Sequence, residues 1–271
     1  MIRPFLISFL VVSLAGLAPI AVPSAADASA RCVPRPVAHR GDSARAPENT
    51  MPAIRRALRV GVSRIEVDVR FTTDDVAVLM HDPTVDRTTN GSGEVAALTR
   101  AQVRRLDAGR WFSRRYAGVN VPSLRYILEY GRSRGAFYLV ELKVLPTETQ
   151  MAGLARVLQE TRMVDRVRFT SFSPDIVLSV RAALPGVRTA LTDPPRYRRP
   201  SSVLQYGRTY VVHQDSVTRE RVRVWHRAGI TLRTWTVDSR RTWRRLARAD
   251  AGAVITNRPK AYLEWARNYC R

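Results

Sequence analysis

The feature that most restricts the fold of this chain is a regular alternation of strand-like and helix-like segments. Short runs rich in Val, Ile, Leu and Phe recur between segments whose apolar residues follow a helical period. Such an alternation predicts a parallel sheet in which helices connect successive strands. The number of units suits an α/β fold of the (β/α)8 TIM-barrel type. We find no internal repeat or linker that would divide residues 31–271.

Nine segments are expected to form strands, so one of them should lie outside the barrel, although the sequence does not identify it. The expected strands are residues 36–40, 64–70, 76–81, 137–144, 166–172, 187–192, 210–214, 231–237 and 252–256. The expected helices are residues 51–60, 123–134, 147–162, 174–184, 218–228 and 240–249. Residues 83–121 lack a strand period, and residues 193–200 form a loop rich in proline and arginine.

The N-terminal segment has the pattern of a secretory signal peptide. Arg3 precedes the apolar run Phe5–Leu17, and residues 28–30 (Ala-Ser-Ala) offer a cleavage site of small residues. An uncleaved membrane anchor is the alternative, but Pro19 interrupts the apolar stretch. We therefore expect residues 1–30 to be removed and the mature protein to be secreted or extracytoplasmic.

The two cysteines, Cys32 and Cys270, stand at opposite ends of the expected mature chain. In an exported protein an even pair suggests a disulfide, and closing a barrel brings its ends together. Such a bond would contribute on the order of 4 kcal/mol in the chain-entropy model. Two unpaired thiols are the alternative.

The basic composition favours anionic partners, because the formal net charge is +22. However, Lys143 and Lys260 are the only lysines among 45 basic residues, a bias typical of genome-wide codon preference. No nucleic-acid-binding motif accompanies the charge, so we expect no nucleic-acid partner. In a chain that uses arginine almost everywhere, Lys143 indicates that a compact ammonium is needed at its position.

The expected strand at residues 64–70 carries two carboxylates on one face. Side chains alternate along a strand, so Glu66 and Asp68 share a face that excludes Ile65 and Val67. Two buried acids repel each other and lose hydration, so they persist only where a cation or proton neutralises them. Oxygen ligands at this spacing suit a hard divalent ion such as Ca2+ or Mg2+. Pairing with a neighbouring arginine is the alternative.

Other polar residues also fall at or near the carboxyl ends of the expected strands, which form the active-site face of a (β/α)8 barrel. The full set is His39, Arg40, Glu66, Asp68, His81, Glu141, Lys143 and Trp235. The two histidines supply acid–base groups that titrate near neutral pH. A lone histidine after a strand is more often structural, and we interpret His213 and His226 in that way.

These motifs resemble those of the glycerophosphodiester phosphodiesterase family over roughly residues 36–262. Many short motifs in one order are far more specific than any one of them. The matching pieces are His39-Arg40-Gly41, Glu48-Asn49-Thr50, Glu66-x-Asp68, His81-Asp82-Pro83, Arg87-Thr88-Thr89-Asn90-Gly91-x-Gly93, Asp107-Ala108-Gly109, Pro122-Ser123-Leu124, Glu141-Leu142-Lys143, Trp235-Thr236-Val237 and Ile255-Thr256-Asn257-Arg258-Pro259. The resemblance implies a (β/α)8 barrel with a small insertion after the third strand, here residues 83–121.

The resemblance also implies how a phosphodiester would be bound. Glu66, Asp68 and Glu141 would hold one divalent cation, with Ca2+ favoured over Mg2+. This ion would polarise a phosphoryl oxygen and stabilise the charge that develops during displacement. Arg40 and Lys143 would bind the remaining phosphate oxygens.

In the same way, the resemblance implies that His39 acts as the base and His81 as the acid. The sequence does not distinguish attack by a glycerol hydroxyl, which would give a cyclic phosphate, from direct attack by water. Glu48 and Trp235 are weaker candidates for the substrate pocket. Helix entry and turn bonding are the alternative for Glu48, and core packing is the alternative for Trp235.

We therefore predict an exported, metal-dependent hydrolase that cleaves glycerophosphodiesters to glycerol 3-phosphate and an alcohol. A lysophospholipase D or a sphingomyelinase-D-like enzyme, acting on a lipid-derived phosphodiester, is the nearest alternative. A second alternative, from another class, is a non-catalytic protein that captures polyanions at a basic barrel mouth. Loss of a catalytic histidine or of a metal-binding acid would indicate such a protein, and the sequence retains all of these residues. Peripheral contact with an anionic membrane or a cell-wall polymer, and the oligomeric state, stay open.

Overall fold

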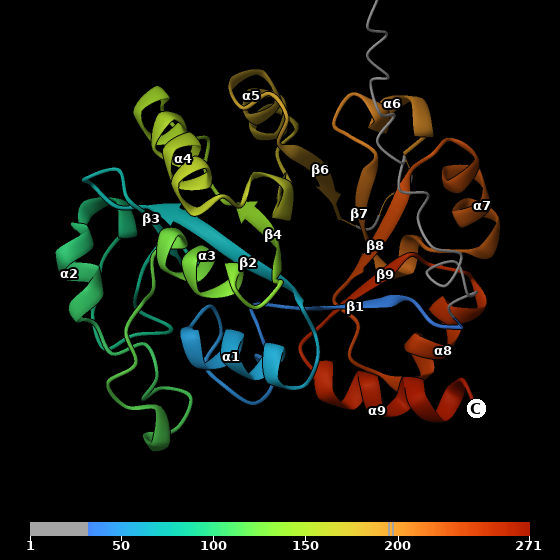
Figure 1. Ribbon diagram of the computed structural model, residues 1–271, viewed down its shortest axis with the longest axis horizontal. Helices are drawn as coiled ribbons and strands as arrows, with labels where there is room; N and C mark the ends of the chain where they lie inside the picture. Colours follow the sequence, from blue (N-terminus) through green and yellow to red (C-terminus); the bar gives the residue numbers. More distant parts are fainter. Residues whose placement is uncertain (1–31, 195, 197) are drawn as a thin grey trace, which may run out of the picture. The chain divides into compact units, whose positions relative to one another are not determined.

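The computed structural model describes residues 32–194, 196 and 198–271, so the expected signal peptide lies outside the described residues. The described chain forms a closed parallel barrel of eight strands with helices around it (Figure 1). The barrel strands are β1 (Arg35–Ala38), β2 (Arg64–Phe71), β4 (Phe137–Leu142), β5 (Val167–Ser171), β6 (Arg188–Asp193), β7 (Thr209–His213), β8 (Thr231–Trp235) and β9 (Ala253–Thr256). The predicted fold class is confirmed.

The strand pairing closes the barrel through β1. Ala38 of β1 lies opposite Thr256 of β9 on one side and opposite Ile65 of β2 on the other. The remaining strands pair in parallel in the order β9, β8, β7, β6, β5, β4, β2. The first and last strands are therefore neighbours, which places the two ends of the barrel domain side by side.

Of the nine expected strands, the one at residues 76–81 lies outside the barrel. β3 (Ala77–Leu79) pairs antiparallel with the end of β2, with Leu79 opposite Val69. The turn between the two strands is tight, because Asp75 adopts the left-handed conformation with φ of 59°. Residues 83–121 follow β3, the third strand of the chain, as predicted. Because β3 folds back along β2, this insertion comes between the second and third strands of the barrel, β2 and β4.

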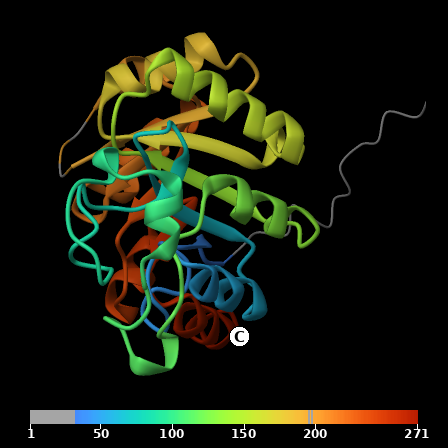
Figure 2. The same ribbon diagram turned by 90° about the vertical axis from the view of Figure 1, so that its left-hand side faces the viewer.

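Residues 83–121 form a small unit with its own apolar cluster. They contain α2 (Arg100–Arg105) and two short 3-10 turns, Val95–Ala97 and Arg114–Tyr116. Val85, Val95, Val103, Ala108 and Val121 are buried together with two residues of the β3 segment, Val78 and Met80. Figure 2 shows this unit on the side of the barrel that faces the viewer.

The barrel helices are α1 (Met51–Arg59), α3 (Leu124–Arg132), α4 (Glu148–Thr161), α5 (Pro174–Ala183), α6 (Pro200–Leu204), α7 (Arg219–Arg227), α8 (Arg240–Arg248) and α9 (Pro259–Tyr269). The sequence did not predict α6 or α9. Each begins with a proline in its first turn, where the missing N–H costs nothing. None of the described helices combines the length and the apolar character needed to cross a bilayer.

Apolar side chains fill the barrel on both faces of the sheet. Inside the barrel, a cluster of small and branched residues packs beneath Trp235: Val37, Leu139, Ala190, Val211, Ala253 and Ile255. Larger clusters lie between the strands and the surrounding helices. Because side chains alternate along a strand, residues that share the phase of the interior cluster point into the barrel.

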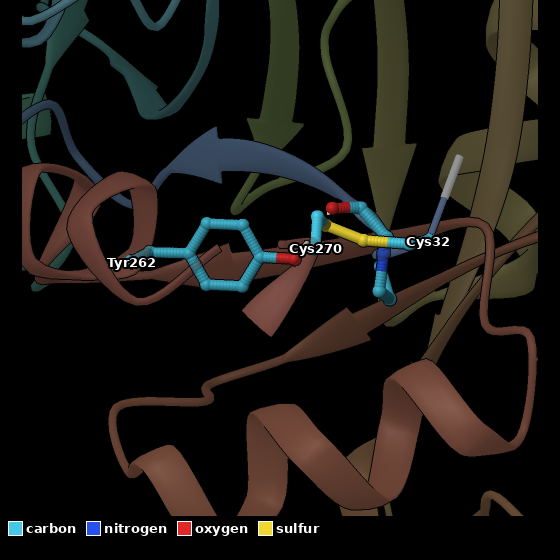
Figure 3. The surroundings of a disulfide bond; sticks show 4 residues. Cys32, Tyr262 and Cys270 are labelled. Atoms are coloured by element: carbon cyan, nitrogen blue, oxygen red, sulfur yellow. Dashed lines mark hydrogen bonds between the residues drawn. A yellow bond between two sulfur atoms is a disulfide. The ribbon is translucent and has the colours of Figure 1, made fainter. Parts of the chain in front are cut away.

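The predicted disulfide between Cys32 and Cys270 is present, with 5.9 Å between the two Cα atoms (Figure 3). It joins the segment before β1 to the end of α9. The nearby Tyr262 hydroxyl donates a hydrogen bond of 2.5 Å to the carbonyl oxygen of Pro34. The covalent link and the hydrogen bond together tie the first strand to the last helix.

Candidate active site

A cavity of about 140 Å3 lies at the carboxyl ends of the barrel strands. Seven of the eight residues predicted at strand ends line it: His39, Arg40, Glu66, His81, Glu141, Lys143 and Trp235. The eighth, Asp68, is almost fully buried and contacts both Arg40 and Lys143. The barrel therefore brings together residues that are far apart along the chain.

Three carboxylates converge beside this cavity. Glu66 and Asp68 come from β2, and Glu141 comes from the neighbouring strand β4, where it lies directly opposite Asp68. Each offers one oxygen, and these oxygens lie within 4.8 Å of one another. Lys143 bridges two of the acids: its Nζ lies 2.9 Å from Asp68 Oδ1 and 2.5 Å from Glu141 Oε1.

Burial and mutual repulsion make this acidic cluster costly when all three carboxylates are charged. Burial and Asp68 raise the pKa of Glu66 well above its usual range and raise the pKa of Glu141 to about 6. Burial alone would raise the pKa of Asp68, but Lys143 and Arg40 outweigh it and hold that pKa below its usual range. A bound cation would relieve the repulsion.

The donor set fits a hard divalent cation. The three acids supply only oxygen atoms, which Ca2+ and Mg2+ prefer. Glu66 Oε1 is buried and has no hydrogen-bond partner among the described residues. A buried carboxylate oxygen left unpaired is destabilising, so a ligand is expected there. These residues are the ones predicted to bind the metal.

The loop after β1 has an unusual backbone that aims its groups at the acids. Arg40 has φ of 53° and Gly41 has φ of 85°. A Cβ atom at Gly41 would lie 2.6 Å from the carbonyl carbon of Ala53, so only glycine fits. As a result, the Arg40 N–H donates a 2.9 Å hydrogen bond to Glu66 Oε2.

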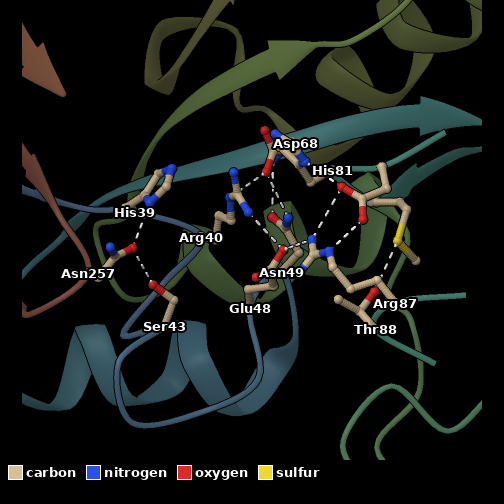
Figure 4. A network of polar contacts seen from close by, with 12 residues as sticks. His39, Arg40, Ser43, Glu48, Asn49, Asp68, His81, Arg87, Thr88 and Asn257 are labelled. Atoms are coloured by element: carbon tan, nitrogen blue, oxygen red, sulfur yellow. Dashed lines mark hydrogen bonds and ion pairs between the residues drawn. The ribbon is translucent and has the colours of Figure 1, made fainter. Parts of the chain in front are cut away.

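Arg40 and Asn49 hold Asp68 from two sides (Figure 4). Arg40 Nε lies 2.9 Å from Asp68 Oδ2, and the Asn49 amide donates a 2.9 Å hydrogen bond to the same oxygen. Asn49 also accepts a hydrogen bond from the Asp68 backbone N–H. Asn49 thus serves the acidic cluster, a role that its position in the Glu48-Asn49-Thr50 motif did not reveal.

His39 is oriented by a residue from the other end of the domain. His39 Nδ1 lies 2.6 Å from Asn257 Oδ1, and the Asn257 side-chain amide donates a 2.6 Å hydrogen bond to Asp238 Oδ2. His39 Nε2 faces the acids, 3.8 Å from Glu66 Oε2. Burial and the nearby Arg40 lower the pKa of His39 to about 4, so the ring is neutral at pH 7.

His81 reaches the cavity by a route that the sequence did not predict. It follows β3, the antiparallel strand, and the Met80 N–H bonds to the Asp68 carbonyl oxygen. The return of the chain along β2 brings His81 back to the level of Asp68. His81 therefore follows an expected strand and lies at the cavity, as predicted, but this strand is the one that lies outside the barrel, which the sequence had not identified.

Asp82 and Arg87 orient His81. His81 Nδ1 lies 2.6 Å from Asp82 Oδ1, and Arg87 Nε donates to Asp82 Oδ2. Arg87 also donates to Glu48, which accepts a further hydrogen bond from Arg40. Glu48 does not line the cavity; it links the Arg40 loop to the His81 loop (Figure 4).

Trp235 forms an aromatic wall opposite the acids. Its ring meets Phe172 edge-on at 5.1 Å and His213 at 5.2 Å between centroids. Trp235 Nε1 is buried and has no hydrogen-bond partner among the described residues. The wall therefore offers an apolar surface and one hydrogen-bond donor to a bound molecule. His226 lies on α7 beside Asp250 and does not line the cavity.

Besides Asn49, four residues of this site had no function assigned from the sequence: Asp82, Arg87, Asp238 and Asn257. Three of them stand within motifs that we had quoted, but no role was assigned to them. The signal that identifies Asn257 is its contact with His39, which lies 218 positions away in sequence. Such a pairing follows from barrel closure and has no local signature.

Comparison with known proteins identifies the group to which these motifs belong. The profile of the Glycerophosphoryl diester phosphodiesterase family matches residues 39–261. A curated Glycerophosphodiester phosphodiesterase of Caldanaerobacter subterraneus subsp. tengcongensis is 31% identical over 235 residues, which cover 85% of this chain and 97% of the relative.

Solved structures are similar over the same region. The crystal structure of a glycerophosphodiester phosphodiesterase from Agrobacterium tumefaciens is 31% identical, with a TM-score of 0.77, over 85% of this chain and 99% of the other. A phosphodiesterase from Oleispira antarctica, solved in complex with the product sn-glycerol-3-phosphate, is 26% identical with a TM-score of 0.80. That match covers 87% of this chain and 97% of the other.

Proposed function

This chain belongs to the glycerophosphoryl diester phosphodiesterase family, and from that premise we propose that it is an exported, metal-dependent enzyme that releases glycerol 3-phosphate from glycerophosphodiesters. The observation that carries the proposal is the convergence of two histidines, three acids and two cations at one cavity. The structural relative from Oleispira antarctica, solved with sn-glycerol-3-phosphate, supports the identity of the phosphate product.

Arg40 and Lys143 would bind the phosphate of the substrate. Both are cationic residues at the cavity, and both are held in place by Asp68. A phosphodiester carries one negative charge, which these residues would neutralise before a nucleophile approaches. The wall formed by Trp235 and Phe172 would face the glycerol or the alcohol moiety.

Glu66, Asp68 and Glu141 would hold the divalent cation, and Ca2+ is our preferred ion. When bound, the ion would polarise a phosphoryl oxygen and stabilise the charge that develops there. Ca2+ accepts flexible carboxylate geometry, whereas Mg2+ demands a nearly ideal octahedron and keeps several waters. The partly buried set of three protein carboxylates is closer to the first pattern.

The two histidines would divide the proton transfers. His39 Nδ1 contacts the side-chain amide oxygen of Asn257, which can only accept a hydrogen bond, so Nδ1 carries the proton of the neutral ring. Nε2 then carries the lone pair and would accept the proton of the nucleophile. His81, paired with Asp82 through Nδ1, would protonate the leaving alkoxide from Nε2. A neutral His39 at pH 7 is consistent with its role as base.

Export is supported by the disulfide, because such bonds persist in oxidising compartments. The N-terminal pattern of residues 1–30 points the same way. Contact with an anionic membrane or a cell-wall polymer through the basic exterior is part of the same proposal.

The experiment that tests this function measures release of glycerol 3-phosphate from glycerophosphocholine by the mature protein. Assays with Ca2+, with Mg2+ and with EDTA are run beside His39→Ala and the matched control His226→Ala. We expect metal-dependent turnover that falls by about 10³-fold in His39→Ala and is retained in the control.

Two results would redirect the proposal. No turnover with either metal, but turnover of lysophospholipids, would favour the lipid phosphodiesterase. Binding of anions that falls steeply with salt, without turnover of any diester, would favour the polyanion-binding protein.

A further inference from the structure

The opposite end of the barrel interior is lined by arginine. Five arginines at the starts of barrel strands, which we call the basic floor, are Arg35, Arg64, Arg168, Arg188 and Arg233. Each stands two positions before a residue of its own strand that faces the barrel interior or the active-site cavity: Val37, Glu66, Thr170, Ala190 and Trp235. Strand alternation therefore directs all five side chains to the inside of the barrel.

These side chains surround a cavity of about 200 Å3. Four of them are half-buried, and Arg188 is exposed at the rim. The sheet register places Arg168 directly beside Arg188. The cavity is therefore open to solvent and lined by closely spaced cations, at the end of the barrel away from the catalytic groups.

The basic floor lacks matching negative charge. Among the described residues, Arg35, Arg168, Arg188 and Arg233 form no salt bridge, and the single carboxylate that lines the cavity is the exposed Asp165. Arg168 Nε is buried without a hydrogen-bond partner in the described chain. Arg64 lies over the ring of Phe137 at 5.5 Å. Buried donors and like charges in this state are destabilising unless an anion meets them.

The electrostatic consequence is visible in two of these groups. Burial and the neighbouring Arg168 and Arg64 lower the pKa of Arg233 to about 9. Burial and Arg188 lower the pKa of Arg168 to about 10. Both guanidinium groups stay charged at pH 7, and each is repelled by the positive charge of its arginine neighbours.

The arginine-rich composition does not account for this arrangement. A codon bias explains why a cation is arginine and not lysine, but it does not place cations at five inward positions. The interior of a (β/α)8 barrel is ordinarily filled with branched apolar side chains. A guanidinium offers a planar fork of donors that matches the oxygens of a phosphate group.

We propose that the basic floor binds a small oxyanion of the size and charge of inorganic phosphate, at a second site distinct from the active site. The anion would receive hydrogen bonds from Arg168 and Arg233 and would neutralise the charge that the five arginines share. This inference does not depend on the proposed function, because none of its residues lines the active-site cavity.

The test is calorimetric titration of inorganic phosphate into the mature protein, in EDTA and at low ionic strength. An active-site variant, Arg40→Gln with Lys143→Gln, removes phosphate binding at the catalytic cavity. A floor variant, Arg168→Gln with Arg233→Gln, removes two central donors. Arg59→Gln, at an exposed arginine on α1, is the matched control for loss of one surface charge.

We expect the active-site variant and the Arg59→Gln control to retain a phosphate site. The affinity of this site for phosphate should fall by about 10-fold or more when Arg168→Gln and Arg233→Gln are introduced. The inference is overturned if the active-site variant binds no phosphate, or if adding Arg168→Gln and Arg233→Gln to the active-site variant leaves its phosphate affinity unchanged. Should the floor variant not fold, Arg188→Gln at the exposed rim replaces it. An unchanged affinity in the active-site variant carrying Arg188→Gln would also overturn the inference.

Discussion

His39 Nδ1 lies 2.6 Å from Asn257 Oδ1, although the two residues are 218 positions apart in the sequence. An amide oxygen can only accept a hydrogen bond, so the proton of a neutral His39 must reside on Nδ1. The orientation of the Asn257 amide is in turn set by Asp238, which accepts from its nitrogen. The first and last strands of the barrel thereby determine which histidine nitrogen faces the acids.

We predict that Asn257→Ala lowers kcat by about 10- to 100-fold and changes KM little. Without Asn257, the His39 ring loses its fixed tautomer and orientation, and these are needed for proton transfer more than for binding. Steady-state kinetics with glycerophosphocholine would measure the effect, with Asn268→Ala on the exposed face of α9 as the control. A rise in KM alone would contradict a positioning role.

Lys143→Arg is expected to lower kcat/KM by roughly 100-fold, whereas Lys260→Arg should have no effect. The Lys143 ammonium fits between Asp68 and Glu141, at 2.9 Å and 2.5 Å. A guanidinium is larger and planar, so it would displace one of the two acids. Lys260 sits on α9 beside Glu264 and is the only other lysine of the chain, which makes it the natural control. Equal activity of both variants would refute the requirement for an ammonium.

A divalent cation should raise the melting temperature of the mature protein, and Glu66→Gln should abolish that increase. The ion would neutralise three carboxylates that otherwise repel one another. At a concentration 100 times the Kd, the expected stabilisation is about 2.7 kcal/mol. Thermal unfolding with EDTA, Ca2+ and Mg2+ gives the measurement, and Glu94→Gln, at an exposed glutamate, serves as the control. No shift with either ion would count against a metal site at these residues.

Replacing both cysteines by serine should lower the free energy of unfolding by roughly 4 kcal/mol. The disulfide joins residues separated by 238 positions, so it closes a long loop and lowers the conformational entropy of the unfolded state. Denaturation in guanidinium chloride would measure the loss, and the parent protein treated with a reductant provides an independent comparison. A double variant as stable as the oxidised parent would contradict this expectation.

Asp82→Asn should destabilise the protein at pH 6 more than at pH 3. Hydrogen bonds from Arg87 lower the pKa of Asp82 from 3.8 to about 2. A carboxyl group with a depressed pKa in the folded state contributes stability above its unfolded pKa, and loses it as the pH falls toward 2. Urea unfolding at the two pH values gives the comparison, with Asp175→Asn at an exposed aspartate as the control. A destabilisation independent of pH would indicate a packing effect only.

The sequence alone predicted the barrel and most of its active-site face. Strand alternation, helix periodicity and the location of Glu66, Glu141, Lys143 and Trp235 at strand ends are local properties, so they can be recognised without coordinates. The two helices that it missed, α6 and α9, begin with proline, and α6 is too short to show a clear period.

Tertiary structure decided which strand lies outside the barrel and which distant residues meet. β3 turns back along β2 through a left-handed Asp75, and this reversal, not a barrel strand, delivers His81 to the cavity. Closure of β1 on β9 brings Asn257 to His39 and Cys270 to Cys32. The same closure gathers the arginines of the basic floor. Such pairings join residues far apart in the chain, and only the completed barrel brings them within bonding distance.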